Sequence, residues 1–205
     1  MLATTLLTFA LASCAFAYPS YRTCDISNAS IAYPEGASTL PAPINKPSYV
    51  AVAIGTQNYT CSAAGTYNLV GAVAELYDTS CLYNTPLFSK VATRAYKAWK
   101  SAPASWTPQK AIRLLYPTPA ALGQHYFVTN PVTGVGSSPK WDFTSTGATK
   151  GNANAYVVAA KNTGLAAPTG AQDIDWVYLK SVAGSLAQEV YRVDTRGGQP
   201  PASTN

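Results

Sequence analysis

Alternation of apolar and polar residues is clearest between Tyr49 and Leu82, in the run YVAVAIGTQNYTCSAAGTYNLVGAVAELYDTSCL. This pattern predicts two core strands joined by a turn at Ala64-Gly65. Shorter runs rich in Val, Tyr and Trp follow, bounded by Gly, Pro or Asn: LGQHYFVTNP, KWDF, NAYVVAAK, DIDWVYLKSV and EVYRVDT. We count about seven to nine strands, which favours a mainly β fold, an antiparallel sandwich or barrel, over alternating β/α units.

The last two of these runs should pair with each other. DIDWVYL and EVYRVDT flank a short connection, and we expect them to form an antiparallel pair around a turn at Val182 to Leu186. Trp176 lies among the alternating apolar residues of the first run, so we expect its side chain to be mostly buried.

One amphipathic helix is predicted between the two β-rich halves, from about 86 to 101. Thr85 is a suitable N-cap, Pro86 suits the first helical position and Pro103 ends the pattern. Apolar residues recur at four-residue spacing and should dock the helix onto the β-domain: Leu87, Val91, Ala95 and Trp99.

Positive charge is concentrated around this helix. The chain has a formal charge of +5, yet Asp and Glu are absent from Thr79 to Trp141. Lys90, Arg94 and Lys97 form the predicted solvent face of the helix, a basic patch that could contact an acidic polysaccharide or a membrane surface. A charged outer face is more often simply solvated.

The N-terminus predicts secretion. Residues 1–17 form an uncharged apolar run that ends in Ala15-Phe16-Ala17, which is typical of a signal peptide cleaved before Tyr18. We expect a Pro-rich extended segment over 18–47 and one β-rich domain over 48–205. No further stretch is long and apolar enough to span a bilayer, so we predict an extracellular or cell-wall-associated protein without a transmembrane segment.

Three cysteines remain after the signal sequence, which allows one disulfide. We expect Cys61–Cys81, because their strands should be neighbours, with Cys24–Cys81 as the alternative. Two sequons, at Asn28 and Asn58, are glycosylation candidates in a secreted chain, and Asn58 would need an outward-facing side chain.

Several long motifs occur together in order: GTQNYTC, GAVAELYDTSCL, GQHYF, PTGAQDIDWVYLKSV and YRVDTRGGQPP. In these motifs the chain resembles the secreted fungal branch of the family called domain of unknown function 3455, over roughly Cys24 to Pro201. The resemblance implies no established activity. Similar sequences often end in a cysteine that this chain lacks, which implies that Cys24 has lost its partner and that Cys61–Cys81 is the intact bridge.

Relatives in that family sometimes carry dehydrogenase names, which this sequence does not support. A nicotinamide enzyme needs a Gly-rich turn that opens a helix, but Gly134-Val135-Gly136 and Gly197-Gly198 are each followed closely by proline. We therefore exclude a malate dehydrogenase and expect no cofactor. We also expect no metal site and no nucleic-acid partner, since the chain has a single histidine and lacks the motifs of either class.

His125, that single histidine, is a weak catalytic candidate. As a general base it would need a carboxylate to orient it, and Asp142 is the nearest in sequence. A histidine between Gln124 and Tyr126 at a strand end is more often structural.

Three acids are further weak candidates. Asp173 and Asp175 would share one face of a strand about 7 Å apart, a separation that glycosidase carboxyl pairs adopt, although acids after Pro-Thr-Gly are more often turn-formers. Glu75 is an acid inside a core strand. It should face solvent or pair with Arg192.

From these observations we expect a non-catalytic secreted protein that binds cell-wall polysaccharide or a surface protein. Its 14 tyrosines supply stacking surface for such ligands. The alternative is a secreted hydrolase that acts on polysaccharide through Asp and Glu carboxylates. A cleft where two carboxylates converge, or where His125 meets Asp142, would favour the hydrolase. Scattered positions would favour the binding protein.

Overall fold

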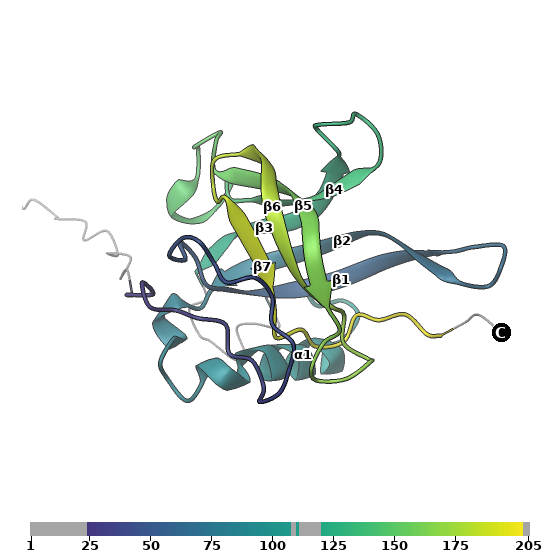
Figure 1. Cartoon of the computed structure of the whole chain (residues 1–205), viewed down its shortest axis with the longest axis horizontal. Helices are drawn as coiled ribbons and strands as arrows, with labels where there is room; N and C mark the ends of the chain where they lie inside the picture. The colour runs from purple at the N-terminus through teal and green to yellow at the C-terminus, as the bar shows by residue number, and fades with distance from the viewer. Residues whose placement is uncertain (1–23, 108–109, 111–119, 203–205) are drawn as a thin grey trace, which may run out of the picture.

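Seven antiparallel strands form one curled sheet, a half-barrel, in the computed structural model, which describes residues 24–107, 110 and 120–202 (Figure 1). The strands neighbour one another in chain order, so the sheet is a simple meander. They are β1 Ala51–Cys61, β2 Tyr67–Asp78, β3 Ala121–Thr129, β4 Ser137–Asp142, β5 Tyr156–Leu165, β6 Trp176–Gly184 and β7 Glu189–Arg192. The predicted mainly β, antiparallel fold with an inserted helix is confirmed.

The hairpin of β1 and β2 is the longest pair and extends beyond the rest of the sheet. Its register runs from Ala51 opposite Asp78 to Cys61 opposite Tyr67. β3 pairs with β2 only between Ala74 and Tyr77, so the outer half of the hairpin has no third strand (Figure 1). Gly65 at the turn has φ +74°, a conformation that favours glycine.

Helix α1 (Val91–Ser101) follows the short 3-10 helices η1 (Ser80–Leu82) and η2 (Phe88–Lys90) and packs on the hairpin. Its apolar face packs on the hairpin as predicted: Ala95 is buried against Val52, Ile54 and Tyr77 of β1 and β2, and Val91 and Trp99 pack against this cluster. Leu87 was expected in this face but is 37% exposed. The α-helix begins only at Val91, so Leu87 lies before it and off its apolar stripe.

Two faces of β5 to β7 bury different residues because side chains alternate along a strand. One face holds Val157, Ala159, Val177 and Leu179, and a neighbouring cluster joins β2 to the start of β5 across the curl. The other face holds Trp176, which is 3% exposed, as predicted. β6 and β7 pair antiparallel from Val177–Arg192 to Lys180–Glu189, which confirms the expected pair.

Residues 24–50 carry neither helix nor strand and cross the outer face of β6 and β7 (Figure 1). Leu40 packs with Trp176 there. The Glu189 carboxylate accepts hydrogen bonds from Ile44 N (3.1 Å) and the Tyr178 hydroxyl (2.7 Å), which fixes the segment to β7. In the described part of the chain, no helix combines the length and apolarity needed to cross a membrane.

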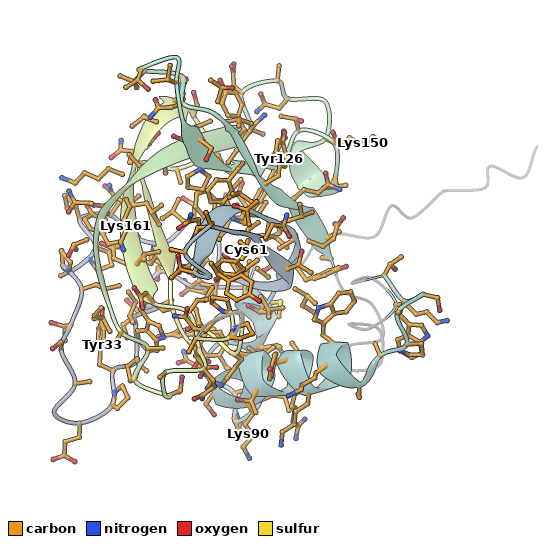
Figure 2. The ribbon with its side chains drawn as sticks, turned by 90° about the vertical axis from the view of Figure 1, so that its right-hand side faces the viewer. Tyr33, Cys61, Lys90, Tyr126, Lys150 and Lys161 are labelled. Atoms are coloured by element: carbon orange, nitrogen blue, oxygen red, sulfur yellow. A yellow bond between two sulfur atoms is a disulfide. The ribbon has the colours of Figure 1, made fainter. Side chains whose placement is uncertain are left out.

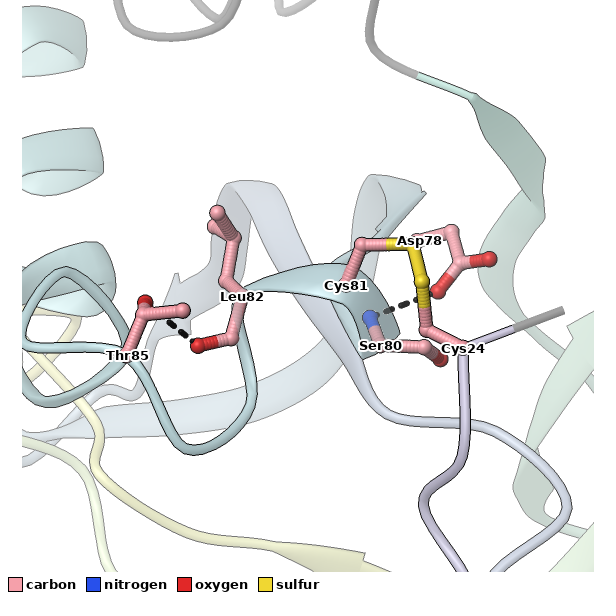
Figure 3. The surroundings of a disulfide bond; sticks show 6 residues. All are labelled: Cys24, Asp78, Ser80, Cys81, Leu82 and Thr85. Atoms are coloured by element: carbon pink, nitrogen blue, oxygen red, sulfur yellow. Dashed lines mark hydrogen bonds between the residues drawn. A yellow bond between two sulfur atoms is a disulfide. The ribbon is translucent and has the colours of Figure 1, made fainter. Parts of the chain in front are cut away.

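The disulfide joins Cys24 to Cys81, with 5.0 Å between their Cα atoms (Figure 3). The preferred prediction, Cys61–Cys81, was wrong. Cys61 ends β1 beside the turn, whereas Cys81 follows β2 at the opposite end of the same hairpin. An 11-residue strand at about 3.3 Å per residue holds the two more than about 30 Å apart. The bridge instead anchors the N-terminal segment beside η1.

Replacement of Cys24 and Cys81 by alanine should destabilise the protein by about 4 kcal/mol, because their bond closes a loop of 57 residues and restricts the unfolded chain. Urea unfolding of the wild type and the double variant measures the difference. Non-reducing peptide mapping is the companion experiment. A linked Cys61–Cys81 peptide would contradict the structure.

Candidate functional site

An open groove of about 430 Å³ lies between β1, helix α1 and the C-terminal segment. Its walls carry four aromatic rings from three elements: Tyr59 on β1, Tyr67 on β2, and Tyr96 and Trp99 on α1. The remaining lining comprises Gly55, Thr56, Gln57, Lys100, Gly198, Gln199, Pro200 and Pro201. Figure 2 looks toward the end of the hairpin, where Cys61 is labelled, with α1 beneath it.

Local backbone geometry places the rings. The β1–β2 register shifts between Asn58 and Tyr59, and such a bulge re-aims the side chains that follow it. The rings of Tyr59 and Tyr67 meet edge to face at 6.5 Å. Tyr96 and Trp99 are three residues apart on α1, so they lie on adjacent positions of the helix surface.

The Tyr59 hydroxyl donates a 2.8 Å hydrogen bond to the Gly198 carbonyl, which ties β1 to the C-terminal segment. Burial raises the pKa of Tyr59, while the charge of Arg192 acts in the opposite direction. The phenol is therefore neutral at physiological pH and remains a donor. This bond forms one side of the groove.

Asp173, a predicted catalytic candidate, fixes the same C-terminal segment from the other side. It is 4% exposed, and its carboxylate accepts hydrogen bonds from the Thr169 hydroxyl and the Gly197 amide, both at 2.5 Å. Gly197 has φ +69° and packs so closely on Tyr96 that a Cβ atom would lie 2.5 Å from the ring. Asp173 thus holds the segment in place and does not face the groove.

Asp175 does not form a carboxyl pair with Asp173 on one strand face. β6 begins at Trp176, so both acids precede the strand, and Asp173 forms an isolated bridge with Gly198. The backbone carbonyl of Asp175 accepts two hydrogen bonds from the Arg192 guanidinium, at 3.2 and 2.9 Å.

His125 and Asp142 lie on opposite faces of the sheet. His125 is opposite Trp141 in the β3–β4 register, and Asp142 is opposite Gln124, so the two side chains point to different sides. The His125 ring stacks on Trp141 at 4.6 Å, and its Nδ1 lies 2.9 Å from the Lys140 carbonyl. This placement rules out the dyad.

Asp142 belongs to a surface cluster with Tyr126 and Lys140. Its Oδ2 accepts from the Tyr126 hydroxyl at 2.6 Å and pairs with Lys140 Nζ at 2.8 Å, while Thr144 donates to Oδ1 (Tyr126 is labelled in Figure 2). Burial alone would raise the pKa of Asp142, but these hydrogen bonds outweigh it and hold the pKa far below its usual value. The cluster links β3 to β4 through a charged hydrogen-bond network.

Glu75 pairs with Gln124, whose amide donates to Oε1 at 2.9 Å, and Arg192 is engaged elsewhere. Of the two arrangements expected for Glu75, the ion pair with Arg192 is absent among the described residues, and the side chain is half-buried rather than fully solvent-exposed. Both sequon asparagines, Asn28 and Asn58, are exposed. Among the described residues, no cluster of three or more His, Cys, Asp or Glu side chains could hold a metal ion.

The groove could not be predicted from the sequence. The abundance of tyrosine and the apolar face of α1 that carries Trp99 were evident there, but not the grouping of Tyr59, Tyr67 and Tyr96. These residues come from separate elements, which the hairpin register, the packing of α1 on β1 and the path of the C-terminal segment bring to one groove. The one signal was the Pro200-Pro201 pair, which is typical of an extended segment.

Replacement of Asp173 by alanine should destabilise the protein by about 2 kcal/mol, because it leaves the buried Gly197 amide without its acceptor. Amide exchange of residues 196–199 should accelerate at the same time. Asp175→Ala is the matched control, since the hydrogen bonds from Arg192 reach only its backbone carbonyl. A wild-type melting temperature for Asp173→Ala would contradict the structural role.

Acid should destabilise the protein through His125. Burial lowers its pKa from 6.5 to about 4; the charge of Arg192 adds to this effect and the hydrogen bond with the Lys140 carbonyl opposes it. The unfolded chain therefore binds the proton first, so stability present above pH 6.5 is lost as pH falls toward 4. The loss should reach about 3 kcal/mol. Urea unfolding across this range should show a smaller slope for His125→Gln, and an unchanged slope would contradict the assignment.

The chain matches one family of known proteins. No curated protein and no solved structure matches the chain significantly. Residues 41–205 match a family model described as "Protein of unknown function (DUF3455)". Because this region includes all seven strands, α1 and the groove, the chain belongs to the DUF3455 family.

Proposed function

We propose that this chain is a secreted, non-catalytic protein of the fungal branch of its family and binds cell-wall polysaccharide through the groove. The observation that carries the proposal is the lining itself. Four aromatic rings converge with the amides of Gln57 and Gln199, and no carboxylate or imidazole is among the described lining residues.

This lining suits a sugar chain. Tyrosine and tryptophan present broad apolar faces with a polar edge, and the apolar faces can pack on the C–H surfaces of pyranose rings. Side-chain amides donate to and accept from hydroxyl groups. The groove has the volume of typical small-molecule sites and is open at the surface, so a polymer can lie along it without threading.

The rings are held before any ligand arrives. Trp99 packs against the cluster on β1 and β2, Tyr59 is fixed by Gly198, and Tyr96 is in contact with Gly197. Little side-chain freedom remains to be lost on binding, which favours affinity.

A polysaccharide hydrolase receives less support. Hydrolysis of a glycosidic bond needs an acid and a second carboxylate placed on either side of it. Here Asp173 fixes the C-terminal segment, Glu75 bonds Gln124 and Asp142 bonds Lys140. His125 lacks a carboxylate partner. The Cys24–Cys81 disulfide is compatible with the oxidising environment that the proposed secretion implies.

Pull-down on a panel of insoluble neutral and acidic polysaccharides tests the proposal. Wild-type protein should be retained on at least one of them, and Tyr67→Ala should weaken retention about tenfold, because a stacked ring contributes about 1 kcal/mol or more. Tyr67 contacts Tyr59 at the groove wall and is not in the buried core, so the variant should fold.

Tyr49→Ala is the matched control, because Tyr49 is 38% exposed and contacts Phe143 outside the groove. Equal retention of both variants would argue against the groove. Binding of a cell-surface protein to the immobilised wild-type chain, with no retention of the chain on any polysaccharide, would argue for a protein partner instead. Release of soluble sugar from any substrate would support the hydrolase.

A further inference from the structure

The basic patch of α1 begins at the edge of the groove. Lys100 lines the groove, and its Nζ lies 5.8 Å from the centre of the Tyr96 ring. Successive basic residues three or four positions apart occupy one side of a helix. The resulting row consists of Lys100, Lys97, Arg94 and Lys90, all exposed. It extends the groove by about 15 Å along the outer face of α1.

No acid in the part of the chain that the structure describes pairs with this row. The ion pairs of the described residues are Lys140–Asp142 and Arg196–Asp194, and neither involves α1. Another basic residue, Arg196, donates to Thr93 on the same helix, and its charge is paired with Asp194. Like charges at this spacing repel one another and weaken a helix slightly, so an anion that binds along the row would relieve repulsion.

The outer face of α1 favours a polymer over a lipid surface. Interfacial helices carry exposed apolar residues beside their basic ones. The exposed residues of α1 are Arg94, Lys97, Lys100 and Ser101, with no apolar side chain among them. The aromatic rings lie instead in the groove at the end of the row.

We propose that the groove and the basic row form one continuous site for a polyuronate, a polysaccharide whose sugar rings carry carboxylates. Sugar rings pack on Tyr67, Tyr96 and Trp99, while the carboxylates of following residues lie beside Lys100 and Lys97. The inference rests on the proposed function and names its ligand class. The aromatic groove provides affinity for sugar, and the row selects the acidic polymer.

The experiment compares one polysaccharide in two charge states. Polygalacturonate and its fully methyl-esterified form share the same chain, but only the first is anionic. In affinity electrophoresis at low ionic strength, wild-type protein should bind polygalacturonate about tenfold more tightly than the ester, and added salt should reduce this ratio because exposed charges are screened. Lys97→Gln/Lys100→Gln should bring the ratio close to one, while Tyr67→Ala should weaken binding of both forms.

Lys150→Gln/Lys161→Gln is the matched control. It removes the same net charge at two exposed lysines that lie far from α1 (Figure 2), and it should keep the wild-type ratio. An equal loss of preference in both double variants would overturn the inference in favour of non-specific charge. All substituted lysines are exposed, so melting temperatures should remain close to wild type.

The remaining outcomes separate the inference from the proposed function. Equal binding of both forms, with loss on Tyr67→Ala, overturns the polyuronate preference and leaves the polysaccharide-binding function intact. Binding to neither form nor to any polysaccharide of the panel overturns both. Binding to phosphatidylserine vesicles, reduced by Lys97→Gln/Lys100→Gln, with none to polygalacturonate, replaces the polymer with a membrane.

Discussion

The two end strands of the sheet, β1 and β7, do not pair with each other, and this is the constraint on which the rest of the structure depends. The sheet order runs from β1 to β7 without a pairing between the two end strands, and a sheet edge exposes unpaired backbone groups that must be covered. The C-terminal segment meets this need by crossing toward β1. Ile174 N donates to Gly197 O at 3.0 Å on one side, and Tyr59 donates to Gly198 on the other. The groove exists because an irregular segment and a helix, not another strand, cover β1.

Acidic side chains serve this closure and similar links elsewhere. Asp173 holds the C-terminal segment, Glu189 holds the N-terminal segment and Asp142 clips β3 to β4. Each carboxylate uses its oxygens as acceptors for these structural hydrogen bonds. A general acid needs instead a carboxyl group that can reach the substrate and donate a proton to it. The positions of these residues therefore explain why the geometry supports binding more than hydrolysis.

The periodic pattern of apolar residues predicted the elements that are held in place by one apolar face. The alternation of β1 and β2 and the spacing of Val91, Ala95 and Trp99 identified the hairpin and the face of α1 correctly. The disulfide was mispredicted although the same pattern contained the answer. In a hairpin with its turn at Gly65, Cys61 can face only residues near Tyr67, and Cys81 lies too far along β2. Adjacency of strands does not imply adjacency of their residues, because register fixes each pair.

Long-range contacts determine the roles of the candidate site residues and the position of the groove. No local sequence pattern encodes these contacts. Asp173 looked like a turn residue or half of a carboxyl pair, and its role depends on Gly197, which is 24 positions away. His125 and Asp142 looked compatible in sequence, but one residue of register places them on opposite faces. The groove depends on both the curl of the sheet and the path of the C-terminal segment. Residue types alone could indicate stacking chemistry but not where the rings would meet.

The sign of charge on α1 is nearly independent of the fold. A helix of 11 residues is marginal by itself and depends on packing, which here comes from Val91, Ala95 and Trp99 against the hairpin. Exposed charges contribute little to folding, so acidic, basic or neutral residues on the outer face would each leave the core unchanged. Long-range attraction between charges does act on an approaching ligand. The basic row is therefore not needed to hold the helix in place, which leaves it available for the proposed ligand.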